Sequence, residues 1–372
     1  MKLLRVKASH FKNCCDGFTI DLTPKSRKTA EDKEYELQEI APDLHVFNTA
    51  AFIGKNASGK STAVELLDCA YSILGEFRLE DKHYSYDGVE LEMHFYHEGF
   101  IYLYTTSLAS GKTMNNQACF QNEHIYRKEY FKTNSKEIFN SEGYEELTAL
   151  GDLPEDTSNI FFILKKKKTR AVFFDSYSGG AETYQLLFHA LKNYDISMDV
   201  LGKIIRIFDA SILELKKLDD HNYRVKTETE SRTMSDSQLV YYLSSGTTKG
   251  ILLYTLMVAS LREGFDLIID EVENHFHKTL VENMISLYKD KSINRHNATL
   301  IFSTHYCEVL DQMGRQDNIW ICNANSHVHL TNMYEDYNIR AVLLKSKQYY
   351  ANAFKTAVNY EDLMGLKKVL KG

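Results

Sequence analysis

The chain has 372 residues, of which 44% are hydrophobic and 26% are charged, and its formal net charge is −7. These are the values of a globular chain long enough to bury a large core. They exclude disorder, collagen-like repeats and low-complexity sequence as the main organisation. They also exclude a strongly basic protein that wraps nucleic acid, although a local basic patch is compatible with them.

The cysteines and the apolar segments indicate the compartment. The 6 cysteines include no C-x-x-C pair, which argues against a zinc ribbon or a redox pair and for a reduced, intracellular setting. Residues 1–12 are basic and lack the apolar region of a signal peptide. The longest apolar stretch, residues 251–261, is about half a membrane span and indicates a buried helix. We therefore expect a cytoplasmic protein without a membrane partner.

The N-terminal part of the chain predicts two kinds of element. Residues 3–8 and 18–22 alternate apolar and polar side chains, which predicts a β-hairpin. The charged residues 25–40 predict a surface loop or a short helix. Residues 46–53 form an apolar, β-rich run, and residues 61–74 carry apolar side chains at helical spacing. The segment therefore predicts a strand, a glycine-rich turn and a helix.

The rest of the chain predicts an α/β protein. Residues 89–108 predict a second hairpin, and residues 110–180 show no clear pattern. Residues 183–208 have the apolar spacing of a helix, and residues 212–226 alternate apolar and polar side chains as a strand does. From residue 250 onward, strands and helices alternate as in a parallel sheet: helix 250–262, strand 265–270, helix 278–289, strand 298–303, helix 305–313 and strand 318–322. The tail, 338–372, has a mostly helical pattern.

A phosphate-binding loop is the most specific motif. It fits G-x-x-x-x-G-K-[ST], lies between the predicted strand and helix, and consists of Gly54, Lys55, Asn56, Ala57, Ser58, Gly59, Lys60 and Ser61, followed by Thr62. Glycines let backbone N–H groups converge on phosphate oxygens, and a helix N-terminus adds its positive dipole. We expect Lys60 to reach the β- and γ-phosphates and Ser61 to ligate Mg²⁺.

Two carboxylates follow the predicted strand 265–270. We expect Asp270 to hold Mg²⁺ and Glu271 to polarise the attacking water. An alternative is a strand that ends in solvated acids. A transition-metal cluster is a further alternative, but its spacing of two suits one face of a strand that should already have ended; its residues would be Glu271, Glu273, His275 and His277.

Two further segments complete a series. Residues 243–249 precede a strong helix and resemble the signature segment of ABC ATPases. That resemblance implies that Ser244, Ser245 and Gly246 face a γ-phosphate held by another subunit. The alternative is a plain Ser-Gly N-cap. His305 follows the predicted strand 298–303 and resembles the switch histidine of the same enzymes, which implies a contact with the γ-phosphate; alone, such a histidine is usually a surface residue.

The order of these motifs resembles that of the ABC-ATPase heads of SMC and DNA-repair ATPases, over residues 1–80 and 205–330. Residues 8–13 resemble the basic segment of that group, in which Lys12 would approach the nucleotide. Asp270-Glu271-Val272-Glu273 followed by His277 resembles the compact, OLD-like AAA-type ATPases of bacterial phage-defence and abortive-infection systems.

The resemblance implies a fold and a domain organisation. It implies an α/β P-loop NTPase with a mixed central sheet, an N-terminal antiparallel β subdomain and a helical insertion. The core would comprise residues 1–80 and 205–330, an inserted β/helical subdomain residues 81–204, and a C-terminal helical extension residues 331–372. The stretch from 62 to 242 is too short, and too poor in heptads, for a long coiled coil.

The resemblance also implies a function. The chain would bind ATP and Mg²⁺, form a homodimer or a higher even oligomer around the nucleotide, and hydrolyse ATP as a sensor or scaffold in a phage-defence or DNA-associated complex. Because no D-x-D nuclease pair occurs, the effector, a nuclease or a toxin, would be a separate protein. The alternative is a nucleotide-binding scaffold with little or no turnover. A GTPase is disfavoured because the chain has no N-K-x-D clamp, and a kinase would not need residues 243–249.

Two points stay open in the sequence. The basic run 165–168 with Arg170 would suit a DNA backbone, or it is a solvated face. The glutamine that contacts the metal and the attacking water in related heads has two candidates, Gln117 and Gln121.

Overall fold

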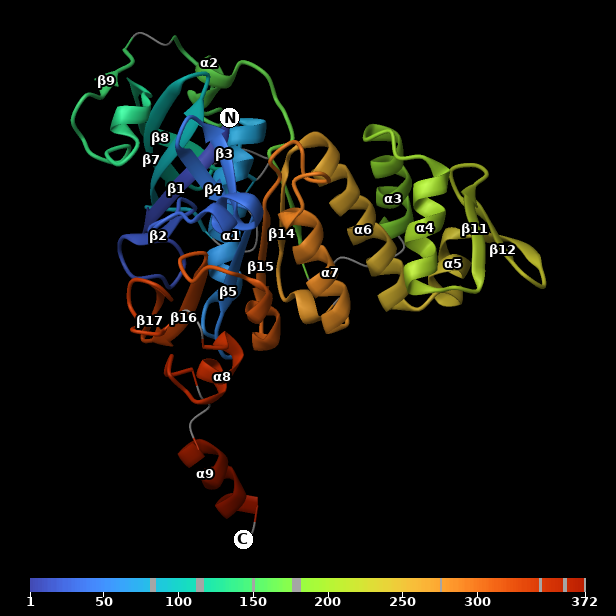
Figure 1. Ribbon diagram of the computed structural model, residues 1–372. Helices are drawn as coiled ribbons and strands as arrows, with labels where there is room; N and C mark the ends of the chain where they lie inside the picture. The colour runs from blue at the N-terminus through green and yellow to red at the C-terminus, as the bar shows by residue number, and fades with distance from the viewer. Residues whose placement is uncertain are drawn as a thin grey trace.

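The computed structural model describes residues 1–80, 85–111, 117–148, 151–175, 182–274, 276–340, 343–356 and 360–370. Two large sheets and a side lobe organise these residues (Figure 1). One sheet is antiparallel and contains the N-terminus, and the other is mixed and lies at the centre. The fold is the predicted α/β P-loop NTPase class.

The antiparallel sheet joins both predicted hairpins. The first pairs β1 with β2, and the second pairs β6 with β7, which continues to β8 and β9. The strand order is β2-β1-β6-β7-β8-β9. The bounds are β1 (Lys2–Ser9), β2 (Phe18–Asp21), β6 (Glu90–His97), β7 (Phe100–Ala109), β8 (Cys119–Glu129) and β9 (Glu145–Glu146).

The central sheet has the order β10-β14-β15-β5-β16-β17. Its first five strands are parallel and β17 is antiparallel, so the sheet is mixed. The carboxyl ends of the parallel strands meet at one edge, where ligands bind in open α/β sheets. The bounds are β10 (Ala171–Phe174), β14 (Asp266–Ile269), β15 (Leu300–Thr304), β5 (Thr49–Ile53), β16 (Ile319–Asn325) and β17 (His327–Asn332).

Helices cover both faces of the central sheet, and its inner strands β14, β15 and β5 are buried at every residue. Helix α1 (Lys60–Glu76) contacts β1 as well as β5, β14 and β15, and so fills the space between the two sheets. Along β5, Ala50 and Phe52 join the core on the α1 side, while Ala51 and Ile53 join the core on the opposite face. That alternation is the two-residue period of a strand.

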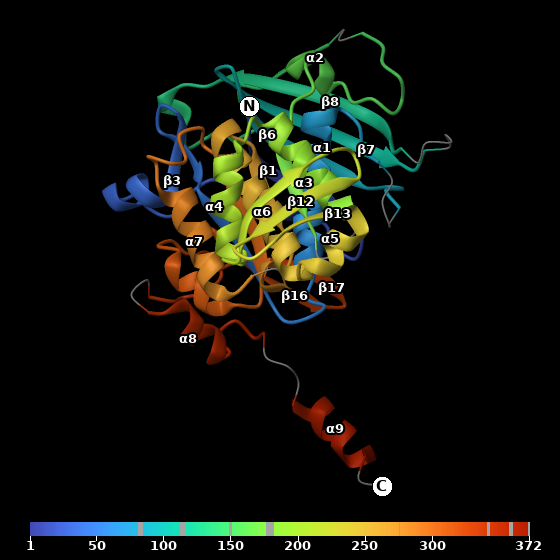
Figure 2. The same ribbon diagram turned by 90° about the vertical axis from the view of Figure 1, so that its right-hand side faces the viewer.

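The side lobe lies beyond the opposite face of the sheet (Figures 1 and 2). It consists of helices and a small antiparallel sheet, β11-β12-β13, and most of it falls in residues that the sequence analysis assigned to the core rather than to the insertion 81–204. Its elements are α3 (Glu182–Asn193), α4 (Met198–Phe208), β11 (Ile212–Lys217), β12 (Asn222–Thr227), β13 (Ser231–Ser235), α5 (Asp236–Tyr242) and α6 (Ser245–Glu263). Helix α7 (Lys278–Lys289) covers the same face beside α6.

The remaining elements are short. Among them are a π-helical turn, η1, two 3₁₀ turns near the site, η3 and η4, and the C-terminal helices α8 and α9. The bounds are η1 (Asp32–Glu36), β3 (Leu37–Ala41), β4 (Leu44–Phe47), η2 (Lys132–Asn134), α2 (Ile160–Leu164), η3 (Val272–Asn274), η4 (Cys307–Gln312), α8 (Lys345–Tyr350) and α9 (Tyr360–Leu370). Within the described ranges, none of the helices combines the length and the apolar character needed to cross a bilayer.

Several predicted elements differ from the observed ones. The single strand 46–53 is interrupted at Asn48, whose backbone N–H donates to the carbonyl of Glu36 and whose side chain donates to that of Tyr35. β4 therefore pairs with β3 in a hairpin, and only β5 enters the central sheet. The helix predicted over 183–208 is two helices, because the Ser197 side chain caps a new start at α4. Segment 305–313 forms the 3₁₀ turn η4 rather than an α-helix.

Residues 81–204, predicted as one inserted subdomain, serve three parts of the molecule. β6 to β9 belong to the antiparallel sheet, β10 belongs to the central sheet, and α3 belongs to the lobe. The boundary predicted at 205 falls inside α4, and β17 extends past residue 331.

His94 gives the antiparallel sheet a pH dependence. Its side chain is buried beside Phe139 and Tyr144, and burial, together with Arg5 and Lys128, lowers the pKa of His94 to about 3. An unfolded histidine has a pKa of about 6.5, so below this pH the unfolded chain binds a proton at His94 that the folded chain does not bind. The free energy of unfolding therefore falls as the pH drops below 6.5.

We expect this group to remove about 3 kcal/mol of stability between pH 7 and roughly pH 4.5. Urea unfolding at both pH values measures it. A His94→Leu variant should lose this part of the pH dependence, whereas His329→Leu, at an exposed position, should keep it. An equal pH dependence in wild type and His94→Leu would contradict the assignment.

Candidate nucleotide-binding site

The loop at residues 54–59 joins β5 to α1, as the motif predicted. Gly59 has φ +96° and Ala57 has φ +59°, both in the left-handed region. A Cβ atom at Gly59 would lie 2.2 Å from Cγ1 of Val328, which comes from β17. Because of both its φ and this contact, position 59 accepts only glycine.

The start of α1 is a cradle for an anion. A Cβ atom at Gly54 would lie 2.3 Å from Oγ of Ser58 and 2.6 Å from the carbonyl oxygen of Cys322, so the loop closes tightly there too. The first four amides of a helix have no intrahelical acceptor, and the helix dipole favours negative charge at this end. Ser61 and Thr62 lie in this first turn. The residues present therefore fit a phosphate group.

Lys60 lies within the loop and contacts His305. Its side chain is buried, and Nζ lies 3.4 Å and 3.2 Å from the carbonyl oxygens of Gly54 and Lys55. Nζ also lies 2.9 Å from Nε2 of His305. Since an ammonium group only donates, Nε2 is the acceptor and His305 is neutral in this contact.

The electrostatics agree with this arrangement. Burial lowers the pKa of Lys60, and the carboxylates of Glu271, Glu273 and Asp270 oppose that shift. Burial, followed by the charge of Lys60, lowers the pKa of His305 and keeps its ring neutral near pH 7. A buried cation that faces several carboxylates is the charge pattern expected where phosphates and a metal ion meet.

The two predicted acids follow β14 and are held by β15. Asp270 is buried, and its Oδ1 accepts a hydrogen bond of 2.5 Å from Oγ of Ser303. The same Oγ accepts a 2.7 Å hydrogen bond from the backbone N–H of Glu271. Glu271 has φ +48°, a strained conformation for a residue with a side chain, and its Oε2 accepts from Nδ2 of Asn274 at 2.6 Å. Ser303 therefore fixes both acids.

The strand order brings these groups together. β15 lies between β14, which leads to the acids, and β5, which leads to the phosphate loop. Ile269 pairs with Phe302, and Ile53 pairs with Thr304, so the three strands end almost level. His305 therefore emerges between the acids and Lys60. The structure brings together four of the predicted residues: Lys60, Asp270, Glu271 and His305.

The oxygen donors at this edge fit Mg²⁺. The candidates are the Ser61 hydroxyl and the Asp270 carboxylate, and hard divalent cations prefer such ligands. A second carboxylate, Glu273, keeps a buried Oε2 without a hydrogen-bond partner. The alternative transition-metal cluster gains no support, because the described residues contain no group of three His, Cys, Asp or Glu side chains arranged for a metal. His275 lies outside the described residues.

The segment 243–249 has the local structure of a capped helix start. Oγ of Ser244 accepts from the backbone N–H of Thr247 at 3.0 Å, so Ser244 is the N-cap and α6 begins at Ser245. Ser244 and Gly246 are exposed. Figure 1 shows this end of α6 beside α5 in the lobe, away from the junction of β5 and α1. The segment does not join the phosphate loop of its own chain.

Lys12 lies next to the phosphate loop. Its Nζ pairs with Oε2 of Glu65 at 2.5 Å, on the second turn of α1. Its loop is bound to β17, because the N–H of Val328 donates to the carbonyl of Asn13 at 2.7 Å. Val328 in turn covers Gly59. The resemblance implied that Lys12 approaches the nucleotide, and Lys12 lies close to the phosphate loop.

The two glutamine candidates lie elsewhere. Gln117 forms an isolated β-bridge with Glu80, which lies beyond the C-terminal end of α1. The phosphate loop is at the N-terminal end of α1, about 25 Å away along the helix. Gln121 is on β8, opposite Ser107 in the antiparallel sheet. Neither lies at the carboxyl edge of the central sheet, so both predictions are wrong. The sequence analysis found no clear pattern over residues 110–180, which contain β8, β9 and the connection to β10.

Two residues at this edge, Ser303 and Asp175, were not proposed from the sequence. Glu273 was considered only as a ligand of the alternative metal cluster and as part of the pattern that carries the resemblance. Asp175 follows β10, and the carbonyl of Phe174 accepts from the N–H of Asp270 at 3.0 Å, which places Asp175 next to the acids in register. The apolar run 171–174 followed by an acid repeats the pattern of strand 265–270 and is a signal that the sequence contained.

The basic run 165–168 lies at the other end of α1. The backbone N–H of Lys168 donates to the carbonyl of Gly75 at 3.2 Å, and Lys167 pairs with Glu76 at 3.1 Å. All four lysines are exposed. Positive charge at a helix C-terminus complements the helix dipole. The run therefore has a structural explanation, and it is not part of the phosphate site.

Comparisons with known proteins identify the family of this chain. A solved structure described as "Crystal structure of the SmcHead bound to the C-winged helix domain of ScpA" is similar with a TM-score of 0.46 and 11% sequence identity, covering 89% of this chain and 98% of that chain. No curated protein matches the sequence. The family described as "AAA domain, putative AbiEii toxin, Type IV TA system" matches residues 50–311, which include Lys60, Glu271 and His305. The chain therefore belongs to this AAA-domain ATPase family, as its resemblance to the ATPases of abortive-infection systems predicted.

Proposed function

We propose that this protein binds ATP with Mg²⁺ and hydrolyses it. The observation that carries the proposal is the meeting of Lys60, Asp270, Glu271 and His305 at one edge of the central sheet. Bound Mg²⁺ would neutralise phosphate charge, and Ser61 and Asp270 would hold it.

The chain's own residues have separate roles in this proposal. The backbone amides of residues 54–61 bind the phosphates, and Lys60 contacts the β- and γ-phosphates. Glu271 orients the attacking water and takes up its proton. His305 contacts the γ-phosphate through the ring that lies 2.9 Å from Lys60. Each role uses a group that the fold already places at the edge.

We further propose that the functional unit is a homodimer or a higher even oligomer. The helix start that contains Ser244, Ser245 and Gly246 lies in the lobe, separated from its own phosphate loop (Figure 1), and Ser244 and Gly246 are exposed. A helix N-terminus favours a bound phosphate. In a dimer, this helix start would complete the site of the second subunit.

The proposed setting is phage defence or another DNA-associated complex, with this chain as sensor or scaffold and a nuclease or toxin as separate effector. The family description, which names a putative toxin of a toxin–antitoxin system, supports a defence role. The exposed lysines at 165–168 are the surface for a DNA contact.

Glu271→Gln tests this function. We expect hydrolysis to fall at least about 100-fold while ATP binding persists, because the amide keeps the shape of the side chain but cannot take up a proton. The variant should then form an ATP-dependent dimer. Phosphate release and mass in solution measure the two effects, and Glu282→Gln on α7 is the control for a carboxylate outside the site.

The same experiment addresses the alternative scaffold. A wild type that binds ATP but neither hydrolyses it nor changes its mass, with or without DNA, would contradict the ATPase proposal. The nucleotide-binding scaffold would then be the better account.

A further inference from the structure

The second glutamate after β14 holds the backbone of the residue after β15. Oε1 of Glu273 accepts a 2.7 Å hydrogen bond from the backbone N–H of His305. Glu273 is part of the 3₁₀ turn η3, two residues after Glu271. This contact joins segments that are 32 residues apart in the sequence.

The other oxygen of this carboxylate is costly for folding. Oε2 of Glu273 is buried, and none of the described residues provides a hydrogen-bond partner for it. A buried oxygen without a partner lowers stability, and such groups in native proteins call for an explanation beyond packing. A residue selected only to stabilise this turn would therefore not be a glutamate.

Two hydrogen-bonded links tie the ends of β14 and β15 together. Ser303 binds the carboxylate of Asp270 and the N–H of Glu271. Glu273 provides the second link, and it alone reaches His305. Because the ring of His305 contacts Lys60, the position of its backbone sets where that ring lies relative to the phosphate loop.

We propose that Glu273 is a positioning residue that fixes His305 in the site, a proposal that rests on the ATPase function above. Glu273 touches neither nucleotide nor water in this role. It acts by holding the backbone of His305, so that the ring is placed at the γ-phosphate without reorganisation. Misplacement of a site group by about 1 Å can cost up to 100-fold in rate.

The role requires a hydrogen-bond acceptor rather than a charge, and this makes it testable. Glu273→Ala removes the acceptor, whereas Glu273→Gln keeps an oxygen for the N–H of His305. We expect kcat to fall at least about 10-fold in the alanine variant with KM within about 3-fold of wild type. The glutamine variant should keep kcat within about 3-fold. Should the alanine variant fail to fold, Glu273→Met removes the acceptor at a similar side-chain length.

A second readout does not depend on catalysis. Hydrogen exchange at the His305 amide should be at least about 10-fold faster in the alanine variant than in wild type, because the amide loses its acceptor. The melting temperature of the alanine variant should equal or exceed that of wild type, since the variant removes a partly unpaired carboxylate. If Glu273 had only a structural role, the alanine variant would melt at a lower temperature than wild type.

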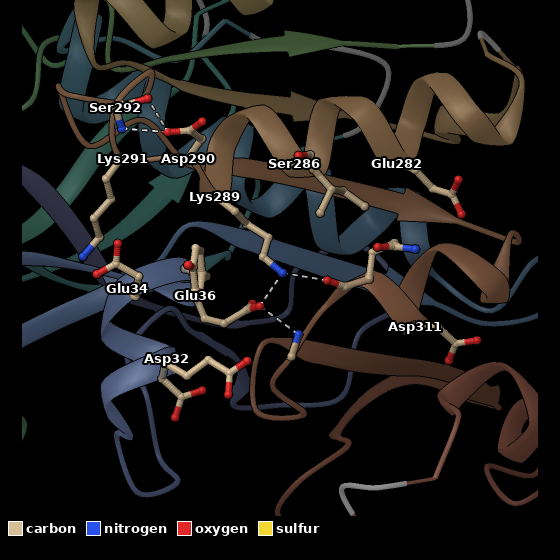
Figure 3. Close-up of a pocket in the computed structure, with 15 residues that line it drawn as sticks. Asp32, Glu34, Glu36, Glu282, Ser286, Lys289, Asp290, Lys291, Ser292 and Asp311 are labelled. Atoms are coloured by element: carbon tan, nitrogen blue, oxygen red, sulfur yellow. Dashed lines mark hydrogen bonds and ion pairs between the residues drawn. The ribbon is translucent and has the colours of Figure 1, made fainter.

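Glu36 provides a matched control. Like Glu273, it has one buried oxygen, Oε2, without a hydrogen-bond partner among the described residues, although its whole side chain is buried and Glu273 is only half-buried. Its Oε1 accepts from the N–H of Gly314 at 2.9 Å and pairs with Lys289 at 2.5 Å. Figure 3 shows it at a cavity of about 620 Å³ between η1, α7 and η4, outside the site. Glu36→Ala should destabilise the protein, because Lys289 loses its carboxylate partner. It should leave kcat unchanged, because Glu36 lies outside the site.

The outcomes separate this proposal from the ATPase function. Unchanged kcat in Glu273→Ala, or equal losses in the alanine and glutamine variants, would overturn the positioning role. If wild type shows no hydrolysis, the ATPase proposal fails, and exchange at the His305 amide decides the positioning role alone. Equal exchange in wild type and Glu273→Ala then overturns it.

Discussion

Replacing Lys60 with alanine is expected to reduce ATP hydrolysis at least about 100-fold, which is the usual cost of removing one donor that stabilises charge in a transition state. Lys60 is buried in the loop, with Nζ between two carbonyl oxygens and the ring of His305. Lys55 is in the same loop and Lys12 lies beside it, but among the described residues Lys60 is the lysine whose Nζ contacts His305, so the variant loses the positive charge at that point. Phosphate release by the purified variant measures the effect.

The control for Lys60→Ala is Lys203→Ala, an exposed lysine on α4 that pairs with Asp199. It should retain hydrolysis within about 2-fold, because exposed ion pairs contribute little. A thermal melt of both variants checks the fold. Undiminished hydrolysis by a folded Lys60→Ala protein would show that the loop is not the catalytic phosphate site.

Replacing Asp266 with alanine is expected to cost about 3–5 kcal/mol of folding free energy. The Asp266 carboxylate is buried at the start of β14, where it pairs with Lys2 at 2.6 Å and accepts from the Tyr71 hydroxyl at 2.6 Å and the Thr299 amide at 2.8 Å. It therefore joins the antiparallel sheet, α1 and the central sheet at one point. Its removal leaves the ammonium of Lys2 buried without a counter-charge.

Urea unfolding measures this cost, and the single tryptophan is a suitable probe. Trp320 is buried on β16 and stacks on Phe52 of β5 with 5.3 Å between ring centroids, so its fluorescence reports on the central sheet. The control is Asp199→Ala, whose partner Lys203 is exposed, and we expect a change below about 0.5 kcal/mol there. Equal midpoints for the two variants would contradict the role of the Asp266 network.

Local patterns were enough to predict the elements that carry the site. Helix α7 was predicted with its observed bounds, and the phosphate loop was visible because its chemistry lies in eight consecutive residues. Strand β14 was visible because Leu267, Ile268 and Ile269 form an apolar run, as expected for a strand that is buried on both faces. These features depend on short-range periodicity and on fixed spacing.

Long-range contacts account for what the sequence did not predict. The break at Asn48 depends on backbone groups 12 and 13 residues away, and strand β10 is defined by pairing with β14, which follows it by almost a hundred residues. The bonds from Ser303 to Asp270 and from His305 to Glu273 join different strand ends. No periodicity in the sequence records such pairings, so the residues that position the acids emerge only in the folded chain.

The contact of Val328 with Gly59 shows that the family match and the folding unit have different limits. The match ends at residue 311, but β16, which pairs with β5, and β17, whose Val328 covers the phosphate loop, both come later in the chain. A fragment cut to residues 50–311 would leave β5 as an open sheet edge with its apolar side chains exposed, a common cause of aggregation during expression. Fragments intended for expression therefore need to keep both the N-terminal sheet and the strands up to Asn332.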